Sequence, residues 1–79
     1  NVTFEDKMID VVRTALKERM VETQQVRQLL KEFTFEQNKL EVAKFCYDKT
    51  TDKSNYYTLY NDFTFSSYSA QLEKYINGK

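Results

Sequence analysis

The chain contains 79 residues, with 12 basic and 12 acidic side chains, one cysteine, no histidine, no proline and a single glycine. This length makes one small domain, residues 1–79, and a formal charge of zero offers no field that would attract nucleic acid or an anionic membrane. One thiol without any imidazole excludes an internal disulfide and a zinc site built from the usual nitrogen and sulfur ligands, so we expect no metal and no other cofactor.

The scarcity of glycine and proline favours helices joined by short polar turns, because hairpins would need those residues at their reversals. The first apolar stripe, with i, i+4, i+7 and i+8 spacing, predicts a helix over residues 4–19. A second helix is expected to begin after Thr23, a good N-cap, and its apolar face consists of Val26, Leu29, Leu30 and Phe33.

Three further helices are predicted in the rest of the chain. The third has an apolar stripe that consists of Leu40, Ala43, Cys46 and Tyr47. Asp52 or Ser54 is expected to cap the fourth helix, and Thr64 or Ser66 the fifth, which runs to the Asn-Gly pair near the C-terminus. The linkers inside each helix pair are short, so consecutive helices should be neighbours.

An internal repeat organises these helices. The tripeptide Phe-Thr-Phe occurs at residues 33–35 and again thirty positions later at residues 63–65, and the apolar positions after it stay in phase. Val11, for example, matches Val42 and Leu72. A period of this length is typical of a supersecondary unit that buries its apolar face only against its neighbours.

The expected architecture is therefore an all-α domain of five short helices. Two and a half helix-turn-helix repeats of about thirty residues form a compact bundle or solenoid. Their units are residues 2–32, residues 33–62 and a half unit at residues 63–79.

Each Phe-Thr-Phe tripeptide stands where one helix ends and the next begins. Phe33 extends the stripe of the second helix, and Thr34 or Glu36 is expected to cap the third. Either cap puts two aromatic rings around a sharp chain reversal. We interpret Phe33, Phe35 and the corresponding Phe65 as core residues, each worth roughly 1.5 to 3 kcal/mol when buried.

Several segments follow one another in a distinctive order: VETQQVRQLLKEFTF at residues 21–35, KLEVAK at 39–44, and NYY at 55–57 followed by FTF at 63–65. Their order and spacing resemble domain of unknown function 4476. The resemblance implies a small helical domain in the C-terminal part of a longer, secreted or lipid-anchored protein of Bacteroidetes-type bacteria, and hence an extracytoplasmic location. The dense tyrosines depart from the family pattern, and the family supplies no catalytic residues to carry over.

Candidate reactive groups have structural interpretations. Cys46 has no histidine to activate it and aligns with aliphatic residues in the other units, so we expect a small buried hydrophobe. The pairs Glu5/Asp6 and Glu32/Glu36 could share a proton or bind a hard cation, but they fall on polar faces or at helix starts, and we interpret them as solvated. No catalytic or metal-binding residue is predicted, and we do not expect an enzyme.

All six tyrosines lie in the second half of the chain, which exceeds what a core requires. Tyr56 and Tyr60 replace aliphatic residues of the first unit, so their hydroxyls are expected at the rim of the core. Tyr57 and Tyr68 align with polar residues and are expected to stand outside the stripe. Tyrosine combines contact area with low entropy cost, so these two are the candidate contacts for a protein or glycan partner.

Three functional hypotheses follow from these patterns. The leading one is a non-catalytic extracytoplasmic module for binding or scaffolding. The second is a structural domain that forms a homodimer through an apolar C-terminal half unit. The third is a carboxylate-based hydrolase, which would need acids that converge in a cleft.

No apolar run approaches the ~20 residues of a membrane span, so no membrane-spanning helix is expected.

Overall fold

The computed structural model describes residues 4–78 and contains five helices in that range. Helix α1 spans Phe4–Ala15, α2 spans Thr23–Leu30, α3 spans Glu36–Tyr47, the 3₁₀ helix η1 spans Lys53–Asp62, and α4 spans Ser66–Asn77. Residues 4–78 form no strand, and extended pairing is confined there to an isolated parallel bridge between Val21 and Thr50. The expected all-α class with about five helices is confirmed.

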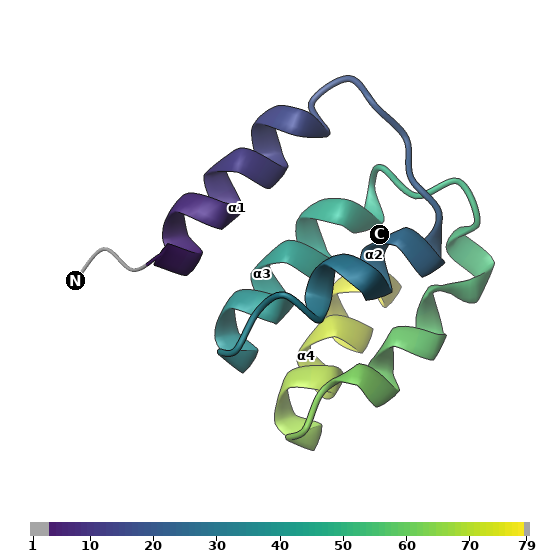
Figure 1. Ribbon diagram of the computed structural model, residues 1–79. Helices are drawn as coiled ribbons and strands as arrows, with labels where there is room; N and C mark the ends of the chain where they lie inside the picture. Colours follow the sequence, from purple (N-terminus) through teal and green to yellow (C-terminus); the bar gives the residue numbers. More distant parts are fainter. Residues whose placement is uncertain (1–3, 79) are drawn as a thin grey trace.

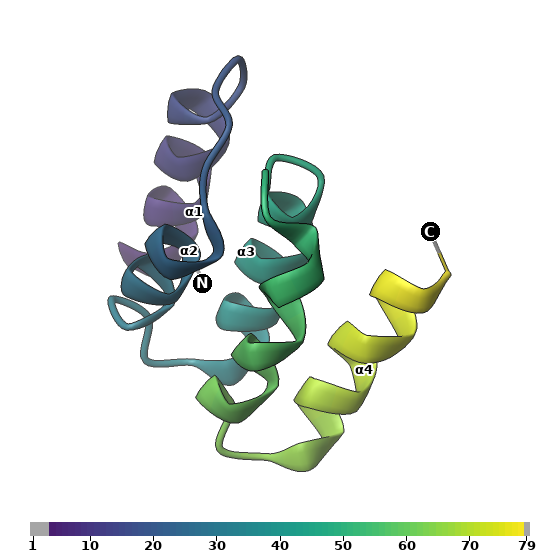
Figure 2. The same cartoon turned by 90° about the vertical axis from the view of Figure 1, so that its right-hand side faces the viewer.

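The helices form two layers (Figure 1). Helix α3 lies between α1 and α4 in one layer and packs on both, while α2 and η1 lie side by side in the other layer. Figure 2 shows the order along the stack, from α1 and α2 at one end, through α3 and η1, to α4 at the other. Helix α1 and helix α4 are therefore the two outer helices of their layer.

The two linkers before α2 and η1 join the first two units. Val21 donates its N–H to the carbonyl of Lys49 at 2.8 Å, and Thr51 donates its N–H to the carbonyl of Val21 at 2.9 Å. The buried Thr50 donates its hydroxyl to the carbonyl of Cys46 at 2.7 Å. These hydrogen bonds join the equivalent turns of two units. The helices on either side of each turn, α1 with α2 and α3 with η1, pack mainly on other helices, so the prediction that consecutive helices are neighbours is not confirmed for these two pairs.

Two helices differ from the sequence prediction. Helix α1 ends at Ala15 instead of residue 19, and the N–H of Lys17 bonds to the carbonyl of Thr14, three residues back, as in a tight final turn. The fourth helix is a 3₁₀ helix, η1. Its serine, asparagine, threonine and tyrosine residues all have modest α-helix propensity, which removes one reason for an α-helix there.

The predicted N-caps are mostly wrong. Glu22 caps α2 and donates its N–H to the side chain of Gln25 at 2.8 Å, while Thr23 is the first helical residue and is bonded to Asp52. Asp52 caps η1, as one of the two predicted alternatives. The caps of α3 and α4 are the second phenylalanines of the tripeptides, in place of Thr34 or Glu36 and of Thr64 or Ser66.

The interpretation of the tripeptide phenylalanines as core residues is confirmed for Phe33 and wrong for Phe35 and Phe65. Phe33 and Phe63 are buried, but Phe35 is 56% exposed and Phe65 is 59% exposed. At the start of both α3 and α4, a carboxylate from the preceding unit binds the N–H groups of the threonine and of this second phenylalanine. The buried hydrophobic residues are Ile9, Val12, Val26, Leu30, Phe33, Leu40, Val42, Ala43, Cys46, Tyr56, Leu59, Phe63 and Leu72.

Within residues 4–78, no helix has the length and apolar character needed to cross a membrane.

Candidate functional site

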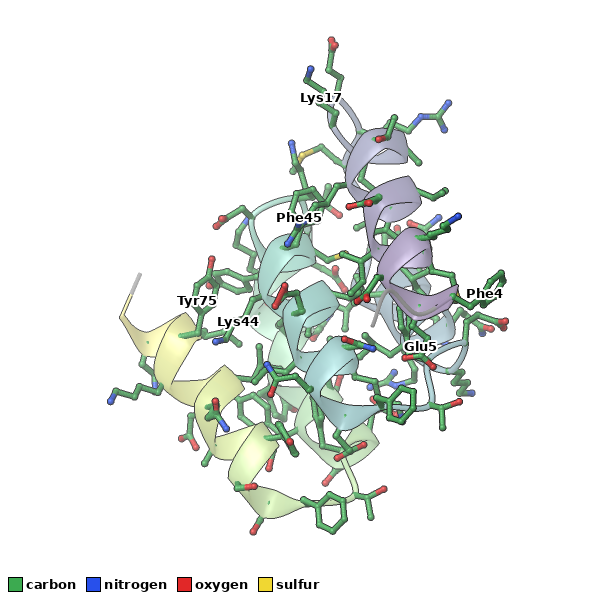
Figure 3. The ribbon with its side chains drawn as sticks, turned by 90° about the vertical axis from the view of Figure 1, so that its left-hand side faces the viewer. Phe4, Glu5, Lys17, Lys44, Phe45 and Tyr75 are labelled. Atoms are coloured by element: carbon green, nitrogen blue, oxygen red, sulfur yellow. The ribbon has the colours of Figure 1, made fainter. Side chains whose placement is uncertain are left out.

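Glu5 is buried at the start of α1 and acts as a structural acceptor, so the prediction of a solvated carboxylate is wrong for it. Its two oxygens accept the N–H of Thr34 at 2.6 Å, the N–H of Phe35 at 3.4 Å and the side-chain amide of Asn38 at 2.9 Å. Burial acts to raise the pKa of Glu5, but these hydrogen bonds outweigh it and hold the pKa below its usual value of 4.5. In Figure 3, Glu5 points toward the beginning of α3.

Glu36, the repeat equivalent of Glu5, makes the same contact one unit later. One of its oxygens accepts the N–H of Thr64 at 2.8 Å and the N–H of Phe65 at 3.1 Å. In both units, therefore, the first-turn glutamate of one helix fixes the beginning of the equivalent helix in the next unit. The contact gives a structural role to the glutamates that follow Phe4 and Phe35.

Helix α1 exposes two large apolar side chains, Phe4 and Val11. Val11, Val42 and Leu72 occupy the same repeat position, yet Val11 is 66% exposed while Val42 is 1% and Leu72 is 0% exposed. The position is covered in α3 and α4 because another unit lies before them in the stack. Phe4 is also highly exposed, and Figure 3 shows it projecting away from α3 and α4.

The opposite end of the stack is more polar. Ile9 and Val12 are buried in α1, and their equivalents Leu40 and Ala43 are buried in α3. In α4 the equivalent positions are held by Ala70 and Glu73, which are exposed. The predicted apolar face of the C-terminal half unit is therefore largely used inside the fold, since Phe63 and Leu72 are buried and Tyr75 and Ile76 are half-buried.

An apolar groove separates α1 from α2 at the N-terminal end. It has a volume of about 330 Å³, and its lining residues are Val11, Val12, Ala15, Leu16, Val21, Gln25, Val26, Leu29 and Cys46. A neighbouring hollow of about 290 Å³ continues along α1 and is lined by Phe4, Lys7, Met8, Val11, Val12 and Leu29. Together with the exposed face of α1, these two hollows form what we call the N-terminal groove.

Cys46 contributes to the groove from α3. Its side chain is fully buried, as the sequence predicted, and burial raises the pKa of the thiol to about 11. A thiol with that pKa is almost entirely protonated near neutral pH and is a poor nucleophile. Its contribution to the groove is therefore that of an apolar wall.

The two candidate tyrosines differ in environment. Tyr57 on η1 is 63% exposed, in line with the expectation that it stands outside the core. Tyr68 on α4 is half-buried, packs against the core, and has its ring centroid 6.4 Å from that of Phe65. Their role in partner binding stays a prediction.

The other tyrosine prediction is wrong for one residue. Tyr56 is fully buried and donates its hydroxyl to the carbonyl of Ala43 at 2.6 Å, so this hydroxyl lies inside the core and not at the rim. Burial raises the pKa of this phenol far above its usual value. Tyr60 is half-buried, and burial together with the nearby Glu73 raises the pKa of its phenol as well.

Local sequence patterns do not indicate the N-terminal groove. Val11 matches Val42 and Leu72 in the repeat, but an apolar stripe gives no sign of which of its members remain exposed. The signal that was available is the repeat: in a stack, the outermost unit presents the face that the other units cover.

Comparison with known proteins gives a family assignment. A family model described as Domain of unknown function (DUF4476) matches residues 1–76, so the chain belongs to this family. No curated protein and no solved structure matches the chain.

Proposed function

We propose that this member of the DUF4476 family is a non-catalytic, extracytoplasmic module that binds a protein partner through the N-terminal groove. The observation that carries the proposal is the contrast at one repeat position, where Val11 is 66% exposed and its equivalents in α3 and α4 are at most 1% exposed. Exposed apolar surface beside a concave hollow is typical of protein-binding sites. At the opposite end, the equivalents of Ile9 and Val12 are the small Ala70 and the charged Glu73, so less apolar surface is exposed at these positions and the groove is the better binding face.

The chemistry of the two most unusual side chains supports a binding role over a catalytic one. Glu5 uses its carboxylate oxygens for three hydrogen bonds within the fold, and these bonds favour its ionised form. Cys46 is buried with a pKa of about 11, which disfavours the thiolate. Both groups have a structural use that a catalytic role would disturb.

The extracytoplasmic location rests on the resemblance to secreted and lipid-anchored family members. It is tested by fractionating cells that express the full-length protein with an epitope tag after residue 79. We expect the tag in the envelope or the medium. Recovery of the tag with soluble cytoplasmic markers would contradict the location while leaving the binding proposal untouched.

The binding function is tested by selecting peptides from a random 16-residue display library on the immobilised domain. Selected peptides should lose binding to the Val11→Asp variant, which places a charge in the groove. They should retain binding to Ala70→Asp, a matched change at an exposed position of the opposite end. Failure to select any peptide that depends on Val11 would overturn the proposal.

Tyr57 provides a second candidate surface because its ring is largely exposed. In the same selection, the Tyr57→Ser variant tests it directly. Peptides that depend on Tyr57 and ignore Val11 would move the binding site to η1, and binding of soluble oligosaccharides that is lost in Tyr57→Ser would indicate a glycan partner.

A further inference from the structure

Inside the domain, an amphipathic helix covers the face that is equivalent to the N-terminal groove. Helix α2 packs on both helices of the second unit, α3 and η1, while α1 packs on α3. Its Val26 and Leu30 are each 1% exposed, and Phe33, just after the helix, is also buried. The second unit therefore shows what kind of element covers this face: a short helix with aliphatic residues at positions i and i+4 and an aromatic ring after them.

Polar contacts at both ends of α2 fix it on the second unit. Thr23 donates its N–H and its hydroxyl to Oδ1 of Asp52, at 2.7 and 3.0 Å. Arg27 donates Nε–H to Oδ2 of Asp62 at 2.9 Å and a terminal N–H to the hydroxyl of Thr58 at 2.8 Å. Hydrogen bonds and ion pairs of this kind set the position and direction of a helix more than its overall affinity.

The first unit carries matching acceptors at the equivalent positions, thirty residues earlier. Glu22 is equivalent to Asp52, Gln28 to Thr58, and Glu32 to Asp62. All three are exposed. In the second unit, Asp52 binds Thr23 of α2 and Asp62 binds Arg27 of α2. Glu22 and Glu32 hold the equivalent positions in the first unit, which contains the apolar groove.

We infer that the N-terminal groove binds an amphipathic helix of a partner protein, patterned like residues 23–33 of this chain. The inference rests on the proposed binding function and specifies its ligand. The helix begins with a threonine or serine, carries aliphatic residues at the places of Val26 and Leu30, has an aromatic residue at that of Phe33, and bears an arginine at that of Arg27. Its arginine pairs with Glu32 and its first turn lies at Glu22.

A second copy of the domain fits this surface less well. Two grooves placed face to face would bring the acidic side chains of both copies, Glu22 and Glu32, toward each other, and like charges in an interface are unfavourable. The α2 helix of a second copy is already packed in its own fold. A partner helix with one basic residue satisfies both the apolar groove and the carboxylate of Glu32.

The test uses a fluorescently labelled peptide with the sequence of residues 20–35, because this segment covers the equivalent face in the second unit. Fluorescence anisotropy should show saturable binding to the intact domain, and circular dichroism should show a gain of helix on binding, since an isolated peptide of this length is only marginally helical. Val11→Asp should abolish the binding. If the peptide instead displaced the domain's own α2, it would lie on η1, and its affinity would not change in the Val11→Asp variant.

Charge reversal tests the predicted orientation of the helix. Arg27→Glu in the peptide should weaken binding by about tenfold or more, as should Glu32→Lys in the domain. The two changes together should restore binding, because the ion pair is re-formed with opposite signs. The matched control is Glu73→Lys at the opposite end, which should leave the affinity unchanged.

Three results would overturn the inference. They are the absence of peptide binding, binding that is insensitive to Val11→Asp, and charge reversals that do not compensate each other. If library peptides still bind through Val11 while this peptide does not, the proposed binding function stands and only the helical ligand is wrong. If no peptide of either kind depends on Val11, the proposed function fails too.

Discussion

Replacing Glu5 tests the contact that joins the first two units. Glu5→Ala removes the acceptor of three hydrogen bonds and leaves the N–H groups of Thr34 and Phe35 without it in a partly buried joint. A buried donor that loses its partner costs about 1 to 3 kcal/mol. We expect the free energy of unfolding to fall by about 2 to 3 kcal/mol, a large fraction of the ~5 to 15 kcal/mol typical of a domain.

The same contact predicts a dependence of stability on pH. The pKa of Glu5 is lower in the folded protein than its usual value of 4.5, so the unfolded chain binds the proton first as the pH falls. The contribution of Glu5 to stability is therefore fully present above about pH 5 and is lost on acidification through its folded pKa. Glu5→Gln keeps the size of the side chain but removes this titration, so its stability should change less between about pH 5 and 3.

Urea denaturation followed by circular dichroism, at neutral and acidic pH, measures both effects. The matched control is Glu41→Gln, because Glu41 forms an exposed ion pair with Arg13 and its loss should cost at most about 1 kcal/mol. Two results together would refute the stabilising role of the Glu5 carboxylate. They are a Glu5→Ala variant that is no less stable than the control, and a Glu5→Gln variant that loses stability with acid as steeply as the unmodified protein.

Three further predictions follow from burial and charge. Phe33→Ala should lower the free energy of unfolding by about 3 to 5 kcal/mol and Phe35→Ala by only about 1, since its ring is 56% exposed; equal urea midpoints would contradict this difference. Cys46 should react with a thiol reagent slowly in the folded protein and quickly in urea, and Cys46→Ala should cost about 1 kcal/mol; fast labelling of folded protein would refute its burial. Light scattering should give the monomer mass across a concentration series, because paired grooves would oppose their acidic residues; a dimer would count against the helix-binding account.

The helices were predictable because their cause is local. The apolar stripes and the scarcity of glycine and proline favour helices whatever surrounds them, and the repeat indicated that the helices stack in similar units. Burial inside a stripe was less predictable. Val11 and Val42 are the same residue at the same repeat position, and only the presence of a neighbouring unit makes one exposed and the other buried.

The joints between units were predicted poorly for a related reason. Phe33 and Phe35 flank one threonine, and Phe35 is the extended N-cap residue of α3. Helical periodicity does not continue through an extended residue. Spacing alone therefore could not predict which of the two rings faces the core. The glutamate contact depends on residues 29 positions apart, Glu5 and Thr34, which no local pattern connects. The recurrence of glutamate after Phe4 and Phe35 was the visible sign of this contact.

The central claim is that the domain binds a helical partner through the N-terminal groove, and amide NMR of the ¹⁵N-labelled domain tests it most directly. Titration with the peptide of residues 20–35 should shift the amide resonances around Val11, Ala15 and Leu29, which line the groove. The resonances of Tyr57 and Glu73, which lie outside it, should stay in place. Shifts centred on Tyr57 or Glu73, or the absence of any shift at saturating peptide, would contradict the claim.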